Sequence, residues 1–229
     1  MDEQFEQWLT GFWEGDGSIG VRSNNYGRTQ IVKVSFGQKD RGVLDYIVDV
    51  TGLGVLSPDR EWDTWKLDFN GSRCMPLLEM FSKFVVTEHY CGRLNVALAF
   101  LDMPEVLVHA PTLDWFVGFW DAEGSSGLAG SPRGCLQVNI SQKDRNVLEG
   151  IRSLFGFGSF ARDHAVTKWV ASSKDAVAVS QLLLERSHCV EKRARLEALV
   201  GRIGEGGRVR EWMRTHPEEV EKLKEKTLT

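Results

Sequence analysis

Two segments of this chain share one ten-residue pattern, WLTGFWEGDG at residues 8–17 and WFVGFWDAEG at residues 115–124. Each begins with an aromatic and apolar run that contains a glycine. Each continues with two acids separated by one small residue and closes on a glycine. Such a run is typical of a helix, and the closing glycine is typical of a helix end. The pattern therefore predicts two equivalent helices, each with a carboxylate near its C-terminus.

Further matches indicate that a larger unit is duplicated. QKDRGVL at residues 38–44 is matched by QKDRNVL at residues 142–148, and a weaker match relates residues 89–93 to residues 188–192. The matches occur in the same order and at nearly the same spacing, which indicates an internal repeat. The predicted division is an N-terminal repeat at 1–102, a linker at 103–111, a C-terminal repeat at 112–203 and a polar, helical extension at 204–229.

The pattern of apolar residues predicts the same order of elements in both repeats, αββαββα, which is an α+β unit with an antiparallel sheet. In the first repeat we predict helices at 4–15, 40–50, 74–85 and 90–101, and strands at 18–24, 30–37, 54–60 and 63–69. In the second repeat, Thr112 is the predicted N-cap of the first helix. Its predicted strands are 125–130, 134–141, 157–163 and 166–172, and its further helices are 144–154, 174–186 and 189–203.

The composition is that of an ordinary globular protein, with 42% hydrophobic and 26% charged residues in a chain of 229. The net charge of −4 counts against nucleic-acid binding, since such domains are usually basic, although the distribution of charge matters more than its sum. No apolar run approaches the roughly 18 residues of a membrane span, and the N-terminus does not resemble a signal peptide. We therefore expect no membrane association. The four cysteines show no metal-binding or CxxC spacing, so reduced structural thiols are predicted.

The two repeated helices carry matched small residues. Gly11 and Gly15 lie four positions apart and thus on one helix face, and Gly118 and Ala122 occupy the equivalent places. Small residues on one face let two helices approach closely. The spacing predicts that the two helices pack side by side about a pseudo-twofold axis.

Such packing would make neighbours of Asp16 and Glu123, the last acids of the two motifs. Two carboxylates at the negative ends of two helix dipoles repel each other, and a bound divalent cation removes that penalty. Hard oxygen ligands suit Mg²⁺. The alternative interpretation is that both acids are polar residues before a glycine cap, but their matched positions in two copies favour the cation site.

The motifs at 9–17 and 116–124 resemble those of the LAGLIDADG homing endonuclease family, and the resemblance covers most of the chain up to residue 203. It implies an intron-encoded, single-chain, two-motif enzyme that hydrolyses one phosphodiester on each strand of a long asymmetric DNA target. Two antiparallel sheets would form a DNA-binding saddle, with the motif helices at the central interface. In this family the penultimate acid of each motif binds the catalytic metals. The implied metal site is Asp16, Glu123, Gly15 and Ala122.

The same resemblance implies that Gln38 and Gln142 order water beside the scissile phosphates. One basic residue in each half usually completes such a site, and we assign Arg93 and Lys192 to this role. The rivals that stay open are His89, His188, Lys39 and Lys143. The preceding acids, Glu14 and Asp121, are assigned a structural role near the helix ends.

The alternating strands predict one face of each sheet in the core and one polar face. Arginine and lysine can reach guanine, whereas asparagine and glutamine suit adenine. An ordinary half-solvated sheet would show a similar pattern, which is the alternative. The predicted DNA-binding residues are Arg22, Asn24, Tyr26, Lys33, Ser35, Lys66, Asp68, Arg133, Gln137, Asn139 and Lys168.

From these observations we expect a monomer that binds double-stranded DNA without an obligatory protein partner, in a prokaryotic cytoplasm or an organelle. We expect Mg²⁺ to support cleavage, Mn²⁺ to substitute for it, and Ca²⁺ to support binding without cleavage. Two other functions share this scaffold, an intron RNA maturase and a catalytically inert DNA-binding protein. Retention of both Asp16 and Glu123 argues against the inert protein.

Overall fold

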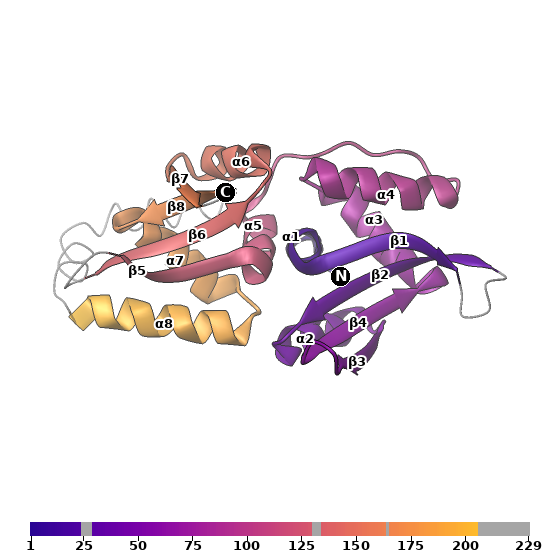
Figure 1. Cartoon of the computed structure of the whole chain (residues 1–229), viewed down its shortest axis with the longest axis horizontal. Coiled ribbons are helices and arrows are strands. Elements are labelled where there is room, and N and C mark those ends of the chain that lie inside the picture. Colours follow the sequence, from indigo (N-terminus) through magenta and orange to yellow (C-terminus); the bar gives the residue numbers. More distant parts are fainter. Residues whose placement is uncertain (24–28, 130–133, 164, 206–229) are drawn as a thin grey trace. The chain divides into compact units, whose positions relative to one another are not determined.

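The structure, a computed structural model, describes residues 1–23, 29–129, 134–163 and 165–205. It contains two compact units, Met1–Ala122 and Glu123–Thr229 (Figure 1). The boundary between these units differs from the linker predicted at 103–111, because most of the second motif helix groups with the first unit. The division of the sequence into repeats at 1–102 and 112–203 stays a prediction.

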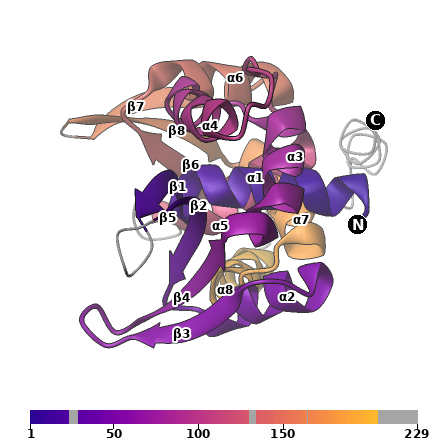
Figure 2. The same ribbon diagram turned by 90° about the vertical axis from the view of Figure 1, so that its right-hand side faces the viewer.

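The first unit contains a four-stranded antiparallel sheet in the order β1-β2-β4-β3. In Figure 2 the helices α1, α2 and α3 lie to one side of this sheet. Its elements are α1 (Glu3–Asp16), β1 (Gly17–Ser23), β2 (Gln30–Gln38), α2 (Arg41–Thr51), β3 (Val55–Asp59), β4 (Thr64–Asn70), the 3₁₀ helix η1 (Gly71–Cys74), α3 (Met75–Phe84), α4 (Glu88–Phe100) and α5 (Leu113–Glu123), of which only Glu123 belongs to the second unit.

The second unit repeats this sheet in the order β5-β6-β8-β7, again antiparallel. Its elements are β5 (Gly124–Ala129), β6 (Cys135–Gln142), α6 (Arg145–Phe155), β7 (Ser159–Asp163), β8 (Val166–Ser172), α7 (Lys174–Arg186) and α8 (Val190–Glu205).

The predicted α+β class and the two antiparallel sheets are confirmed, and most element ends agree within two residues. The formula αββαββα is wrong by one helix, because each repeat ends on two helices, α3 with α4 and α7 with α8. The turn η1 was not predicted. Of the extension predicted at 204–229, only the end of α8 at Glu205 falls within the described residues.

The repeated QKDR segment acts locally as a strand end followed by a helix cap. Asp40 and Asp144 are the N-caps of α2 and α6, and their carboxylates accept from the backbone N–H groups of Gly42 and Asn146, each at 2.9 Å. Such a cap satisfies a backbone donor that the helix leaves without an internal partner. The segment therefore stabilises the first turns of α2 and α6.

Side chains alternate between core and surface along the central strands, as predicted. On β2, the residues Val32, Val34 and Phe36 are buried, while Lys33 and Ser35 remain partly accessible on the other face. On β6, the alternation has the same phase, with Leu136, Val138 and Ile140 buried. A one-residue register slip would exchange the two faces. The alternation thus fixes which polar residues each sheet presents.

Two composition-based predictions can be compared with the structure. The four cysteines, Cys74, Cys91, Cys135 and Cys189, are free. In the described ranges, no helix is both long enough and apolar enough to span a bilayer.

Candidate functional site

Helix α5 packs directly against α1 within the first unit, through two glycines. A Cβ atom added at Gly11 would clash with the backbone carbonyl oxygen of Trp115, and one added at Gly118 would clash with that of Trp8. Each helix backbone therefore fills the space that a side chain of the other would need. The close approach predicted from the small residues is present in α1 and α5.

The two helices also exchange a pair of buried hydrogen bonds. The indole Nε1 of Trp8 donates to Oδ2 of Asp121 at 2.9 Å, and the indole Nε1 of Trp115 donates to Oε1 of Glu14 at 2.8 Å. Both acids are buried. The structural role predicted for Glu14 and Asp121 agrees with these contacts, but the tryptophan partners were not predicted.

Glu14 also joins α1 to the start of α4. Its carboxylate accepts from the backbone N–H groups of Val86 at 2.9 Å and Thr87 at 2.6 Å, immediately before α4 begins. Burial raises the pKa of Glu14 to about 7, although the hydrogen bonds from Thr87, Trp115 and Val86 oppose that shift. Glu14 thus positions a helix that carries a candidate catalytic residue.

Asp16, the last residue of α1, meets Gln38, the last residue of β2. The side-chain Nε2 of Gln38 donates to Oδ2 of Asp16. This contact brings together two residues that the sequence assigned to the site. Within the first unit, the C-terminus of the motif helix therefore presents a carboxylate and a carboxamide side by side.

The basic residue assigned to this half, Arg93, donates from Nη2 to the backbone carbonyl of Ile19 at 2.9 Å. A residue that the sequence did not indicate lies nearer the end of α1: the hydroxyl of Tyr90 donates to the carbonyl of Gly17 at 2.7 Å. The rival His89 packs its ring edge-on against Tyr90. The comparison of the two repeats did not indicate Tyr90, because the matching position in the second repeat is Cys189.

The second unit contains the corresponding group around Glu123, the last residue of α5. The carboxyl of Glu123 hydrogen-bonds with Gln142 and lies in the electrostatic field of Lys192. Desolvation of this carboxyl raises its pKa, and the Lys192 charge and the Gln142 hydrogen bond oppose the shift. Three residues assigned to the second half of the site are therefore brought together.

The rival His188 lies in the same part of the second unit. Burial lowers the pKa of His188, and the charge of Arg193 lowers it further. Both effects favour a neutral ring, so Lys192 is better suited to supply positive charge beside Glu123.

The donor atoms fit a hard cation. Among the described residues, no group of three or more His, Cys, Asp or Glu side chains is placed to hold a metal. Each unit instead offers one carboxylate, Asp16 or Glu123, at the end of a motif helix. Gly15 and Ala122, the other residues assigned to the metal site, directly precede Asp16 and Glu123 in the last turns of these helices. Few protein ligands, all of them oxygen, suit Mg²⁺, which keeps several of its waters.

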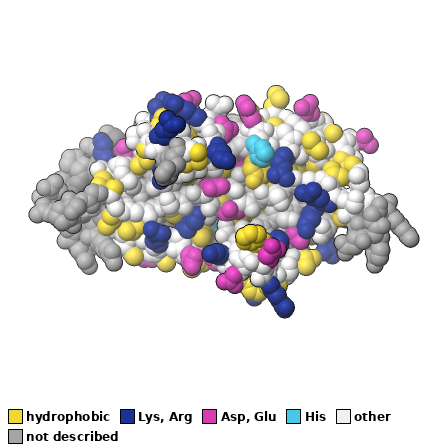
Figure 3. Space-filling model, in the orientation of Figure 1, with side chains coloured by type: hydrophobic (Ala, Val, Ile, Leu, Met, Phe, Trp, Pro, Cys, Tyr) yellow, Lys and Arg dark blue, Asp and Glu magenta, His cyan; other side chains and the backbone are white. Residues whose placement is uncertain are grey.

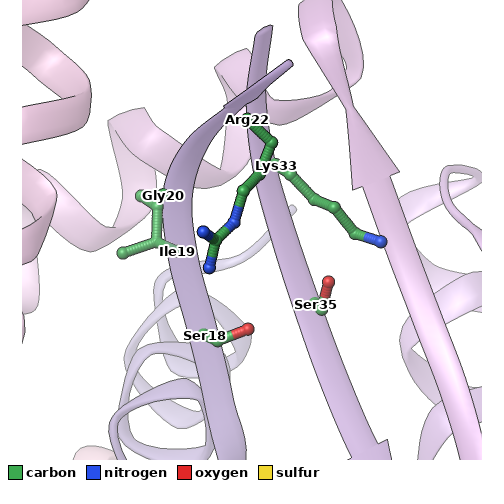
Figure 4. Close-up of a pocket in the computed structure, with 6 residues that line it drawn as sticks. All are labelled: Ser18, Ile19, Gly20, Arg22, Lys33 and Ser35. Atoms are coloured by element: carbon green, nitrogen blue, oxygen red, sulfur yellow. The ribbon is translucent and has the colours of Figure 1, made fainter. Parts of the chain in front are cut away.

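The polar face of the first sheet holds ion pairs. Lys33 Nζ and Ser35 Oγ both donate to the Asp68 carboxylate at 2.7 Å, and Lys66 Nζ pairs with Asp59 at 2.6 Å. A depression of about 190 Å³ lies beside them and is lined by Ser18, Ile19, Gly20, Arg22, Lys33 and Ser35 (Figure 4). On the side drawn in Figure 3, basic and acidic side chains are interspersed.

The equivalent face of the second sheet is built mainly from neutral groups. Ser125 Oγ donates to Asn139 Oδ1 at 2.8 Å, and Gln137 Nε2 lies 3.4 Å from Ser172 Oγ. Lys168 is on β8, opposite Ser141 in the ladder. Three predicted DNA-binding residues, Asn24, Tyr26 and Arg133, lie outside the described residues.

Comparison with solved structures identifies this fold. The chain is similar to the LAGLIDADG meganuclease I-AabMI bound to uncleaved DNA, with a TM-score of 0.65 and 18% identity over 96% of this chain and 98% of the other. It is similar to I-SmaMI bound to an uncleaved DNA target with calcium ions, with a TM-score of 0.65 and 16% identity over 97% of both chains. It is also similar to the LAGLIDADG homing endonuclease I-GzeII in complex with its DNA target, with a TM-score of 0.66 and 15% identity over 96% of this chain and 97% of the other. The fold is thus that of LAGLIDADG meganucleases, as the motif resemblance implied. No family model and no curated protein matches the sequence.

Proposed function

We propose that this protein is a site-specific, metal-dependent endonuclease that cuts both strands of a long asymmetric DNA duplex. The observation that carries the proposal is the repeated acid–glutamine pair. Asp16 contacts Gln38 in one unit, and Glu123 contacts Gln142 in the other, each at the end of a motif helix. A duplex has two scissile phosphates, and two equivalent catalytic groups suit cleavage of both strands.

The side chains suit phosphodiester hydrolysis. In the first unit, Asp16 with the carbonyl of Gly15 would hold Mg²⁺ or Mn²⁺. Glu123 with the carbonyl of the preceding Ala122 would do the same at the end of the other motif helix. A bound divalent ion lowers the pKa of attacking water and stabilises charge on the phosphate oxygens. The carboxamides of Gln38 and Gln142 can hold a water by accepting from it and donating to it.

In the second half of the site, a lysine can supply positive charge beside the reacting phosphate. Lys192 is near Glu123 and can stabilise negative charge that develops on oxygen. In the first half, Tyr90 and Arg93 are the nearest candidates on α4. Both donate to backbone carbonyls of the segment that follows α1, at 2.7 and 2.9 Å. DNA binding could redirect Arg93 toward a phosphate.

Similar folds in structures that contain DNA targets support a DNA substrate. Because both motifs are in one chain, a single chain should bind and cut one duplex. These structures contain DNA, so an intron RNA maturase is the less supported alternative.

The test is selection of cleaved sites from a randomised duplex library in Mg²⁺. Wild-type protein should enrich one long asymmetric sequence, and Asp16→Asn should enrich none under the same conditions. A binding selection in Ca²⁺ should recover the same sequence with both proteins. If the binding selection recovers a sequence that wild-type protein does not cut in Mg²⁺, the protein is a catalytically inert DNA-binding protein and not an endonuclease.

A further inference from the structure

A carboxylate holds two donors at the centre of the first sheet's polar face. Asp68 Oδ2 accepts from Lys33 Nζ and Asp68 Oδ1 accepts from Ser35 Oγ, both at 2.7 Å. The three residues lie on β2 and β4, the two interior strands of the sheet. The Lys33 and Asp68 side chains are 35% and 23% exposed, so both keep a surface toward solvent. We call these three residues the Lys33–Asp68–Ser35 cluster.

The carboxylate in this cluster restricts what can bind there. A phosphate is repelled by Asp68, whereas a base-edge amino group is attracted to it. In the major groove, the available amino groups are N4 of cytosine and N6 of adenine. Each carboxylate oxygen can accept more than one hydrogen bond, so Asp68 can accept another while holding Lys33 and Ser35.

The ammonium group decides between the two base pairs. Lys33 has three N–H donors, and one of them goes to Asp68. The two others match the adjacent acceptors N7 and O6 of guanine, whereas adenine places a donor at N6 beside its N7 acceptor. A lysine that is paired with a carboxylate is therefore complementary to guanine paired with cytosine.

We propose that the Lys33–Asp68–Ser35 cluster reads a single G·C base pair in the half-site bound by the first unit. Lys33 donates to guanine, Asp68 accepts from N4 of the paired cytosine, and Ser35 orients the carboxylate. This assignment rests on the proposed DNA-cutting function and adds to it one specificity determinant.

At the equivalent strand positions that the structure describes in the second unit, no such cluster is present, and this provides a matched control. Asn139 occupies the ladder position of Ser35, and its partner on β8 is Val170, where the first sheet has Asp68 opposite Ser35. Gln137 takes the place of Lys33. This neutral surface favours adenine edges. Changes in the cluster should therefore affect one half-site only.

The experiment measures binding in Ca²⁺ and cleavage in Mg²⁺ for every single base-pair substitution of the selected target. Wild-type protein should prefer G·C at one position of the first half-site by about tenfold or more. Asp68→Asn should abolish most of that preference, since asparagine suits adenine, and should leave the other positions unchanged. Lys33→Met should relax the same position. Asn139→Ala should relax a position in the other half-site.

The results separate the two proposals. The base-reading role would be overturned if Asp68→Asn and Lys33→Met changed the base preference at all target positions alike, or each at a different position. Melting temperatures equal to that of the wild-type protein would show that both variants are folded. An unchanged profile in both variants would overturn it as well. If wild-type protein binds with the expected base preference but does not cut, the G·C-reading role is supported and the endonuclease function is contradicted. Absence of any sequence preference in binding would overturn both.

Discussion

The indole Nε1 of Trp8 donates to the buried Asp121 carboxylate at 2.9 Å, and this contact links α1 to α5. The reciprocal bond runs from Trp115 to Glu14 at 2.8 Å. Each motif helix therefore supplies one donor and one acceptor to the other. Because Asp121 and Glu14 are two residues from Glu123 and Asp16, the exchange fixes the helix turns that carry the candidate catalytic carboxylates.

Removal of either indole donor should destabilise the protein. Trp8→Phe or Trp115→Phe deprives a buried carboxylate of a hydrogen bond, which costs about 1–3 kcal/mol. Urea unfolding, followed by fluorescence or circular dichroism, measures the loss. Trp62→Phe is the control, because Trp62 is 68% exposed. Equal stability of Trp8→Phe and Trp62→Phe would mean that the exchange contributes nothing.

The two interface glycines should not tolerate alanine. Gly11→Ala and Gly118→Ala each place a methyl group against the backbone of the other helix, so α1 and α5 must separate. We expect a loss of several kcal/mol or a failure to fold, because overpacking against backbone cannot be relieved by a rotamer change. Gly92→Ala on α4 is the matched control. A Cβ there meets nothing within 4 Å, and alanine favours a helix. A soluble Gly11→Ala protein as stable as Gly92→Ala would contradict the close helix contact.

The Asp59 carboxylate on the first sheet should weaken DNA binding. Lys66 and Asp59 pair at 2.6 Å; this contact lowers the pKa of Asp59 and raises that of Lys66. Asp59→Asn releases Lys66 for a phosphate and should raise DNA affinity at low salt. The slope of log affinity against log salt should steepen by about 0.9. Lys66→Gln should make it shallower. Weaker binding by Asp59→Asn would indicate that the ion pair itself contacts DNA.

Much of this molecule could be predicted from repetition in the sequence. The duplicated motif predicted the two helices. Gln38 and Gln142 could be assigned to the site because they stand at equivalent positions in the two repeats. The hydrogen bond from Trp8 to Asp121 could not be predicted, since a repeated motif does not show which indole reaches which acid across two helices. Tyr90 was missed because Cys189 matches it in the second repeat. The contact between Lys33 and Asp68 could not be predicted either, because it depends on the pairing of β2 with β4, and the two residues are 35 positions apart in the sequence.

We propose that Asp16 and Glu123 perform catalysis and are not needed for DNA binding or folding. The most direct measurement compares wild-type protein, Asp16→Asn and Glu123→Gln on the selected duplex, with cleavage of each strand in Mg²⁺ and affinity in Ca²⁺. Each variant should lose cleavage by orders of magnitude and retain nearly wild-type affinity and melting temperature. Cleavage of both strands at the wild-type rate by either variant would contradict the claim.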